Sequence, residues 1–261
     1  MSGPRVALQM YTLREETKTD FEGTLRRVAG LGYQGIELAG YGGMAAPGLR
    51  ALLDELGLVA AGSHVRLERL EGALDEELAF AATIGCRDLV CPAVPEGRRE
   101  SIDDYRRLAA LLGQIGRRCR DAGMRFSYHN HAFEFVRLPV DEPAAAGTTA
   151  YALDLLLGWT DPGLVRWEPD VYWIARAGED PVAYLDAYAG RCPLVHIKDM
   201  ADDAERSFAE VGAGTLDLPT ICDAAELGGA EWLIVEQDRC AGPAIESVAR
   251  SIEALRAWGK V

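Results

Sequence analysis

The chain has 261 residues, with 27 Lys and Arg against 41 Asp and Glu, so its formal net charge is −14. An acidic chain of this kind is a poor general binder of phosphate backbones, so we expect no nucleic-acid partner. Hydrophobic residues make up 49% and charged residues 26% of the chain, which excludes a disordered protein. The length is enough for one large core, and we expect a single domain over residues 1–261.

The amino terminus leads directly into an apolar run at Val6–Met10, without the charged and hydrophobic segments of a signal peptide. No stretch approaches the roughly 20 apolar residues that a membrane span needs. The six cysteines show neither a CxxC pair nor a zinc-ribbon spacing, so we expect reduced thiols. These features predict a cytoplasmic protein that does not bind membranes.

Short apolar runs recur along the chain, and each is followed by a polar loop, a stretch with helical periodicity and a glycine. Runs that are apolar on both faces are typical of parallel strands covered by helices. We expect eight strands, at Val6–Met10, Gly35–Leu38, Leu58–Gly62, Asp88–Cys91, Arg125–His129, Arg166–Asp170, Leu194–Ile197 and Trp232–Val235.

The segments between these runs carry helix signals. Apolar residues recur at i, i+4 and i+7 in Phe21, Leu25 and Val28, and Ser101 and Asp180 are typical residues before a helix start. Glycines that follow the last apolar position predict left-handed helix ends, at Gly32, Gly57, Gly85, Gly123 and Gly228.

Eight strand-then-helix units in this length predict an α/β protein with a single (β/α)8 TIM barrel. The alternative is an open doubly wound sheet, but the first turn, Tyr11–Glu16, lacks the glycine-rich phosphate fingerprint of such sheets. The fifth crossover is the least regular. There we expect a surface loop at Pro139–Thr149, followed by a short helix at Ala150–Leu157.

Polar side chains follow six of the expected strands, where a TIM barrel carries its active site. All four histidines of the chain lie at such strand ends. The polar residues are Glu37, His64, His129, Asn130, His131, Glu134, Glu168, Asp170, His196, Lys198, Asp199, Glu236, Gln237 and Asp238.

Taken singly, a histidine at a strand end is more often a hydrogen-bonded core group, and a carboxylate there is often a helix cap or a solvated charge. Glu168 could simply pair with an arginine. Several carboxylates converging on one barrel mouth would repel each other and lose hydration, however, and a divalent cation would relieve that conflict.

Mixed carboxylate and imidazole ligands suit Mn, Co, Zn, Fe or Mg without distinguishing between them. Adjacent parallel strands are only about 4.8 Å apart, so one ligand from each of the last four strands could share an ion. We therefore expect one divalent metal ion, held by Glu134, Asp170, His196 and Glu236.

Five stretches, taken in chain order, make the sequence recognisable. They are Tyr128–Phe135 (YHNHAFEF), Trp167–Trp173 (WEPDVYW), Val195–Met200 (VHIKDM), Val211–Asp217 (VGAGTLD) and Ile234–Asp238 (IVEQD). The chain resembles the sugar phosphate isomerase/epimerase superfamily, the xylose-isomerase-like TIM barrels, over almost its whole length.

This resemblance implies a barrel with a divalent metal at the same four residues, and Glu134 and Glu236 as the catalytic acid/base pair. It implies a sugar isomerase or epimerase of carbohydrate metabolism, acting on a keto-sugar or polyol-derived substrate through a metal-bound enediolate. Several relatives carry a histidine three residues after the aspartate, where this chain has Trp173, so the exact reaction is open. The superfamily also includes inosose dehydratases and endonuclease IV-like enzymes. The alternatives are a metal-dependent lyase of the inosose dehydratase type and a non-catalytic barrel that binds sugar or a partner.

Six residues are expected to contact the substrate, which we take to be a small sugar or polyol: Glu37, His64, His129, His131, Trp173 and Lys198. Glu37 could instead support a metal ligand from outside the first coordination shell. Lys198 could instead pair with Asp199 or Glu236.

Tyr11, Trp173 and Trp232 could together form an apolar wall against a sugar face. Arg239 is either a contact for a phosphate or carboxylate or a surface cation, and the lack of a strong phosphate cradle favours an unphosphorylated substrate. Barrels of this kind often pair, so a homo-oligomer is possible.

Overall fold

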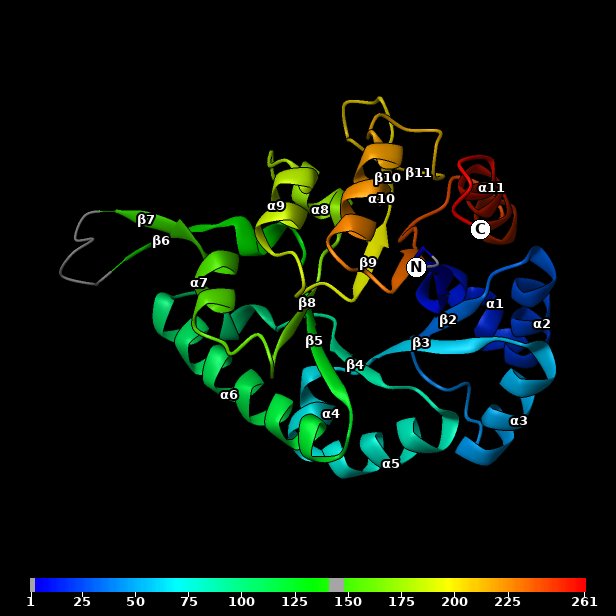
Figure 1. Cartoon of the computed structure of the whole chain (residues 1–261), viewed down its shortest axis with the longest axis horizontal. Coiled ribbons are helices and arrows are strands. Elements are labelled where there is room, and N and C mark those ends of the chain that lie inside the picture. Colours follow the sequence, from blue (N-terminus) through cyan, green and yellow to red (C-terminus); the bar gives the residue numbers. More distant parts are fainter. Residues whose placement is uncertain (1–2, 141–147) are drawn as a thin grey trace.

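The protein is described here from a computed structural model, which covers residues 3–140 and 148–261. Eight parallel strands form one sheet in the order β8-β5-β4-β3-β2-β1-β12-β9, which curls into a nearly closed barrel (Figure 1). The strands are β1 (Arg5–Gln9), β2 (Gly35–Leu38), β3 (Val59–His64), β4 (Asp88–Cys91), β5 (Arg125–His129), β8 (Arg166–Glu168), β9 (Leu194–Ile197) and β12 (Trp232–Val235). The predicted TIM barrel is confirmed, and five of the eight expected strands have the expected bounds.

Helices cover the outside of this barrel and complete the alternating pattern (Figure 1). They are α1 (Arg14–Thr19), α2 (Phe21–Leu31), α3 (Ala46–Leu56), α4 (Leu67–Gly72), α5 (Leu74–Ile84), α6 (Ile102–Asp121), α7 (Ala152–Gly158), α8 (Val171–Arg176), α9 (Pro181–Ala187), α10 (Leu218–Leu227) and α11 (Ala244–Ala257). The expected caps are present, because the side chain of Ser101 accepts a bond from the backbone N–H of Asp104, and that of Asp180 accepts one from Val182. Gly32, Gly57 and Gly85 end their helices in the left-handed region, as expected.

One expected helix end is wrong. Gly228 has a right-handed backbone, and the left-handed residue is the next one, Gly229, with φ +87°. Because two glycines follow each other here, the left-handed residue that ends α10 comes one position later than the apolar pattern indicates.

Two small hairpins interrupt the pattern. β6 (Arg137–Pro139) pairs with β7 (Thr149–Tyr151) at the left edge of Figure 1, and β10 (Asp199–Met200) pairs with β11 (Phe208–Ala209). The loop expected at Pro139–Thr149 is thus flanked by paired strands, and residues 141–147 lie outside the described part of the chain. The following helix begins at Ala152, two residues later than expected.

The barrel closes between β8 and β9 without a regular ladder. The closure is an isolated parallel bridge between Asp170 and His196, in which the backbone N–H of His196 donates to the carbonyl of Pro169 at 2.9 Å. Two residues expected to bind metal therefore also lie at the seam of the barrel, the junction between β8 and β9.

Side chains two positions apart on a strand face the same side of a sheet, and this alternation layers the barrel interior. An apolar layer contains Ala7, Val90, Leu194, Trp232 and Ile234. The inward positions that follow it toward the carboxyl ends carry polar side chains, namely Gln9, Glu37, His129, Glu168, His196 and Glu236. The apolar floor excludes water from one side of this polar layer.

Across the described residues, we find no helix long and apolar enough to cross a membrane. All six cysteines lie within the described ranges and have free thiols.

Candidate metal centre and active site

Four buried side chains at the carboxyl ends of the strands could hold one cation. They are His129, Asp170, His196 and Glu236, and each offers a ligand atom within 4.8 Å of the others. His196 Nδ1 lies 2.9 Å from Glu236 Oε2, and His129 Nε2 lies 3.6 Å from Asp170 Oδ2. The structure thus brings together three of the four expected ligands, with His129 in the fourth place.

Glu134, the remaining expected ligand, is not part of this group. Its Oε1 accepts a hydrogen bond from the Tyr128 hydroxyl at 2.5 Å, and its Oε2 accepts one from the backbone N–H of His131 at 2.8 Å. Both bonds hold the carboxyl within the single 3-10 turn after β5, Ala132–Phe135. Its neighbour His129, the last residue of β5, is the side chain that faces the barrel axis.

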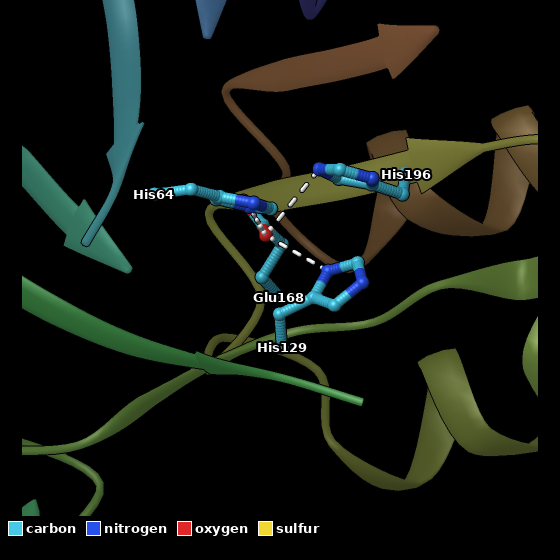
Figure 2. A group of neighbouring side chains, drawn as sticks. All are labelled: His64, His129, Glu168 and His196. Atoms are coloured by element: carbon cyan, nitrogen blue, oxygen red, sulfur yellow. Dashed lines mark hydrogen bonds and ion pairs between the residues drawn. The ribbon is translucent and has the colours of Figure 1, made fainter. Parts of the chain in front are cut away.

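A second group of side chains surrounds Glu168, whose Oε2 lies between three imidazole rings (Figure 2). It is 2.8 Å from His64 Nε2, 3.0 Å from His129 Nδ1 and 3.3 Å from His196 Nε2. Glu168 therefore pairs with histidines and not with an arginine. These four residues could also hold a cation by composition. A carboxylate oxygen occupies the centre of the group, however, so the arrangement is that of an ion-pair cluster.

Glu37 completes this cluster from β2. Its Oε2 lies 2.7 Å from His196 Nε2 and accepts a hydrogen bond from Gln9 Nε2, also at 2.7 Å. Gly62 on β3 leaves the room for this carboxylate, because a Cβ there would come within 2.5 Å of Glu37 Oε1. Glu37 thus contacts a candidate ligand, which favours the supporting role considered for it over a substrate contact.

Lys198 follows β9 and is buried among three carboxylates. Its Nζ lies 2.8 Å from Asp170 Oδ2, 2.6 Å from Glu236 Oε2 and 2.9 Å from Asp238 Oδ2. Of the two partners considered for it, Glu236 is the one it contacts. The Asp199 carboxylate instead accepts backbone N–H bonds from the loop that follows β11, including those of Gly212 and Gly214.

The environment sets different protonation states for these groups. Burial lowers the pKa of His129 well below its usual range, with cationic neighbours acting in the same direction, so its imidazole is neutral. Its Nδ1–H can then donate to Glu168, which leaves the Nε2 lone pair free on the side of Asp170. Burial opposes the ionised form of Glu236, but Lys198 and His196 outweigh it and hold the pKa of this carboxyl well below its usual range.

The aromatic residues expected to form a wall separate into two places. Trp173 and Tyr11 lie in segments that follow β8 and β1, and the Trp173 ring is 5.5 Å from that of His131. Trp232 begins β12 at the opposite end of the barrel, in its apolar floor and beneath the guanidinium of Arg5. The expectation for Trp232 is therefore wrong, because an apolar residue at the start of a strand belongs to the floor.

Two further features lie near the mouth. Arg239 is exposed, which agrees with the surface cation considered for it. A surface cavity of about 660 Å³ is lined by side chains that include Arg99, Phe133 and Phe135. None of the expected site residues lines this cavity, but the Phe133 ring stacks on that of His131.

Three residues of this site, Glu168, Gln9 and Asp238, carry no site role in the predictions from sequence. The signal was the period of two along each strand, because Gln9, Glu37, His129, Glu168 and Glu236 all occupy inward positions at the same end of the barrel.

The residues present fit a divalent cation. Two imidazole nitrogens and two carboxylate oxygens form a common ligand set for Zn, Mn, Fe or Co. The group is fully buried, and its Asp170 Oδ2 accepts no hydrogen bond from the described residues, its partner there being the charge of Lys198.

Comparison with known proteins agrees with this architecture. An inosose dehydratase of Geobacillus kaustophilus is 27% identical over 254 residues, which cover 82% of this chain and 79% of that protein. A sugar phosphate isomerase/epimerase of Parabacteroides distasonis is 28% identical, with a TM-score of 0.79 over 98% of this chain and 95% of that one. An IOLI protein with a bound zinc atom shares the fold at 14% identity, with a TM-score of 0.74 over 97% of each chain.

Other inosose dehydratases match over a shorter region. For the one from Lacticaseibacillus casei, identity is 30% over 154 residues, and the match spans about half the length of that protein (48%). The family model for the xylose isomerase-like TIM barrel matches residues 25–258. The chain belongs to the xylose isomerase-like TIM barrel family.

Proposed function

We propose that this protein is a divalent-metal-dependent sugar isomerase or epimerase that moves a proton next to the carbonyl of a keto-sugar or polyol-derived substrate. The observation that carries the proposal is the buried group of His129, Asp170, His196 and Glu236 at the mouth of the barrel. A divalent ion held there would polarise a substrate carbonyl and stabilise the negative charge that develops beside it. His129 takes the ligand place first expected for Glu134.

Glu236 and Glu134 are proposed as the acid/base pair because their environments separate their protonation states. Glu236 is ionised, since the charge of Lys198 beside it favours the carboxylate. Burial raises the pKa of Glu134 to about 8, so Glu134 carries a proton at neutral pH. Two carboxyl groups in opposite states can accept and return a proton in one turnover.

The remaining residues orient the substrate in this proposal. Lys198 carries a positive charge between Asp170 and Glu236 and can stabilise an oxyanion beside them. His131 is neutral, its Nδ1 accepts no hydrogen bond from the described residues, and its ring faces Trp173, so it can bind a substrate hydroxyl. His64, expected as a substrate contact, is given a supporting role in this proposal, because it faces Glu37 and Glu168.

A metal-dependent lyase is the second candidate. The inosose dehydratase of Geobacillus kaustophilus aligns with most of this chain, and its name gives loss of water as its reaction. Both reactions begin with removal of a proton next to a carbonyl, so the same site would serve either. They differ in whether a neighbouring hydroxyl leaves afterwards.

A single assay separates these candidates. The protein, loaded with Mn²⁺, Co²⁺ or Zn²⁺, is incubated in D₂O with a panel of keto-sugars and inososes, and the products are analysed by mass spectrometry. An isomerase or epimerase gives a product of unchanged composition that gains one deuterium. A dehydratase gives a product lighter by one water. No exchange with any member of the panel would contradict the proposal and favour a non-catalytic sugar-binding barrel.

The pH dependence tests the acid role of Glu134. We expect kcat/KM to fall as the pH rises through about 8, because the Glu134 carboxyl then loses the proton it must donate. The Glu134→Gln variant should lose about 10²–10⁴-fold in activity and should also lose this alkaline limb. An unchanged limb in Glu134→Gln would assign the titration to another group, such as Glu168, whose pKa burial raises to about 8 as well. Asp88→Asn, at the other end of the barrel, is the control and should keep the wild-type profile.

A further inference from the structure

Both candidate histidine ligands have a carboxylate on the ring nitrogen that faces away from the proposed ion. His196 has Glu236 at its Nδ1, whereas its Nε2 lies 2.7 Å from Glu37 Oε2. His129 has Asp170 on the side of its Nε2, whereas its Nδ1 lies 3.0 Å from Glu168 Oε2. A carboxylate on the far nitrogen fixes the tautomer and orientation of a ligating histidine.

His64 contacts both of these carboxylates, Glu37 and Glu168. Its Nε2 lies 2.8 Å from Glu168 Oε2 and 3.2 Å from Glu37 Oε2, at the carboxyl end of β3 (Figure 2 draws the Glu168 side). The rings of His64 and His196 are parallel within 5°, with centroids 5.4 Å apart. The remaining oxygens, Glu37 Oε1 and Glu168 Oε1, are buried and find no hydrogen-bond partner among the described residues. Apart from the bond that Glu37 accepts from Gln9, both carboxylates are held by the histidines between them.

We propose that Glu37, His64 and Glu168 act as one positioning unit, which orients His129 and His196 together and so makes the barrel bind one cation and not two. This inference rests on the proposed metal centre. The alternative, a second cation among His64, His129, Glu168 and His196, requires Glu168 Oε2 to leave the centre of that group, where it already lies within 3.3 Å of three imidazole nitrogens.

The three residues are positioning residues, so their loss should change how the two histidines bind a metal. Removing an outer carboxylate of this kind typically weakens metal binding by about 10–100-fold. Because His64 contacts both carboxylates, replacing either one also removes a contact that holds His64 in place. Replacing the second carboxylate should then weaken metal binding less than replacing the first.

The test is a double-mutant cycle read by Co²⁺ titration, with the Co²⁺ absorption spectrum as the signature of ligand geometry. Glu37→Gln and Glu168→Gln are measured singly and together, in the wild type and in a His64→Ala background. We expect one Co²⁺ per chain in the wild type and an altered spectrum in each single variant. The double variant should bind only about as weakly as the weaker single variant. In the His64→Ala background, the fold-losses in Co²⁺ affinity caused by Glu37→Gln and Glu168→Gln should instead multiply.

Two variants guard against a trivial loss of folding. Gly62→Ala keeps every charge but places a Cβ within 2.5 Å of Glu37 Oε1, so it should reproduce the affinity loss of Glu37→Gln. Glu77→Gln removes a buried carboxylate that pairs with Tyr41 and Arg69 outside the cluster, and it should bind Co²⁺ like the wild type. Each variant is checked by circular dichroism before titration.

The outcomes separate this inference from the proposed function. The wild type could bind one Co²⁺ per chain while the fold-losses in affinity multiply both with His64 and in the His64→Ala background. That result would overturn the positioning unit and leave the metal centre intact. Two Co²⁺ per chain would overturn it in favour of a second cation site. Failure of the wild type to bind Co²⁺ would overturn the proposed metal centre and, with it, the unit built around it.

Discussion

Replacing Asp170 with asparagine should remove tightly bound divalent metal and lower turnover by about a thousandfold, the equivalent of about 4 kcal/mol of lost transition-state stabilisation. Asp170 Oδ2 belongs to the proposed ligand group, and an amide oxygen lacks the charge that balances a cation there. Elemental analysis of the purified variant beside the wild type measures the metal, and His196→Ala should behave in the same way. We expect about one ion per wild-type chain.

Asp88→Asn is the matched control for this experiment. Asp88 is also a buried carboxylate on a barrel strand, but it pairs with Arg125 at the amino-terminal end of the barrel, 2.6 Å away. Its replacement should leave the metal content unchanged. A wild-type protein without metal, even after reloading with Mn²⁺, Co²⁺ or Zn²⁺, would remove the basis for the proposed function but would leave the fold as described.

Lys198→Met should lower the free energy of unfolding of the metal-free protein by about 3–5 kcal/mol, because it leaves buried carboxylates without their cation. Asp170 and Glu236 lie within 2.8 Å of the Lys198 ammonium and are buried. Urea denaturation in the presence of a chelator measures the change. Lys260→Met is the control, since Lys260 also pairs with two carboxylates, Asp223 and Glu226, but both of these are exposed to solvent, so the change should cost at most about 1 kcal/mol.

Added metal gives this prediction a second readout. A ligand that binds only the folded state stabilises it, by about 2.7 kcal/mol at one hundred times its Kd. Mn²⁺ should therefore stabilise Lys198→Met more than the wild type, because the ion no longer competes with an ammonium for Asp170 and Glu236. Equal stabilisation of both proteins would place the ion away from these two carboxylates.

The strands and the mouth of the barrel could be predicted because apolar runs and the polar residues after them are local patterns. This pattern alone places Asp170, His196 and Glu236 at the mouth of the barrel, where the structure brings them together with His129. Glu134 and His129 lie five residues apart in one polar segment, and both are polar residues that follow or end the same predicted strand. The end of β5 is predicted correctly, but the sequence does not show that the Glu134 carboxyl accepts bonds from Tyr128 and from the backbone of His131.

The partners of buried charges could not be predicted for a similar reason. Glu168 contacts His64 across 104 positions of the chain, and His196 contacts Glu37 across 159. Which carboxylate meets which histidine depends on the stagger of the strands around the barrel, including the irregularity between Ile36 and Glu37. The residue types therefore indicated a metal site, whereas the division into ligands and supporting residues required the fold.

The seam between β8 and β9 places two of the proposed ligands side by side. Asp170 and His196 form the bridge that closes the barrel there, and because the bond is made by backbone groups, it sets the spacing of these two side chains. His129 ends β5 and Glu236 follows β12, and both of these strands pair with a neighbour on each side. An engineer who wished to change the preferred ion should therefore exchange side chains at these four positions and keep the backbone geometry at the seam unchanged.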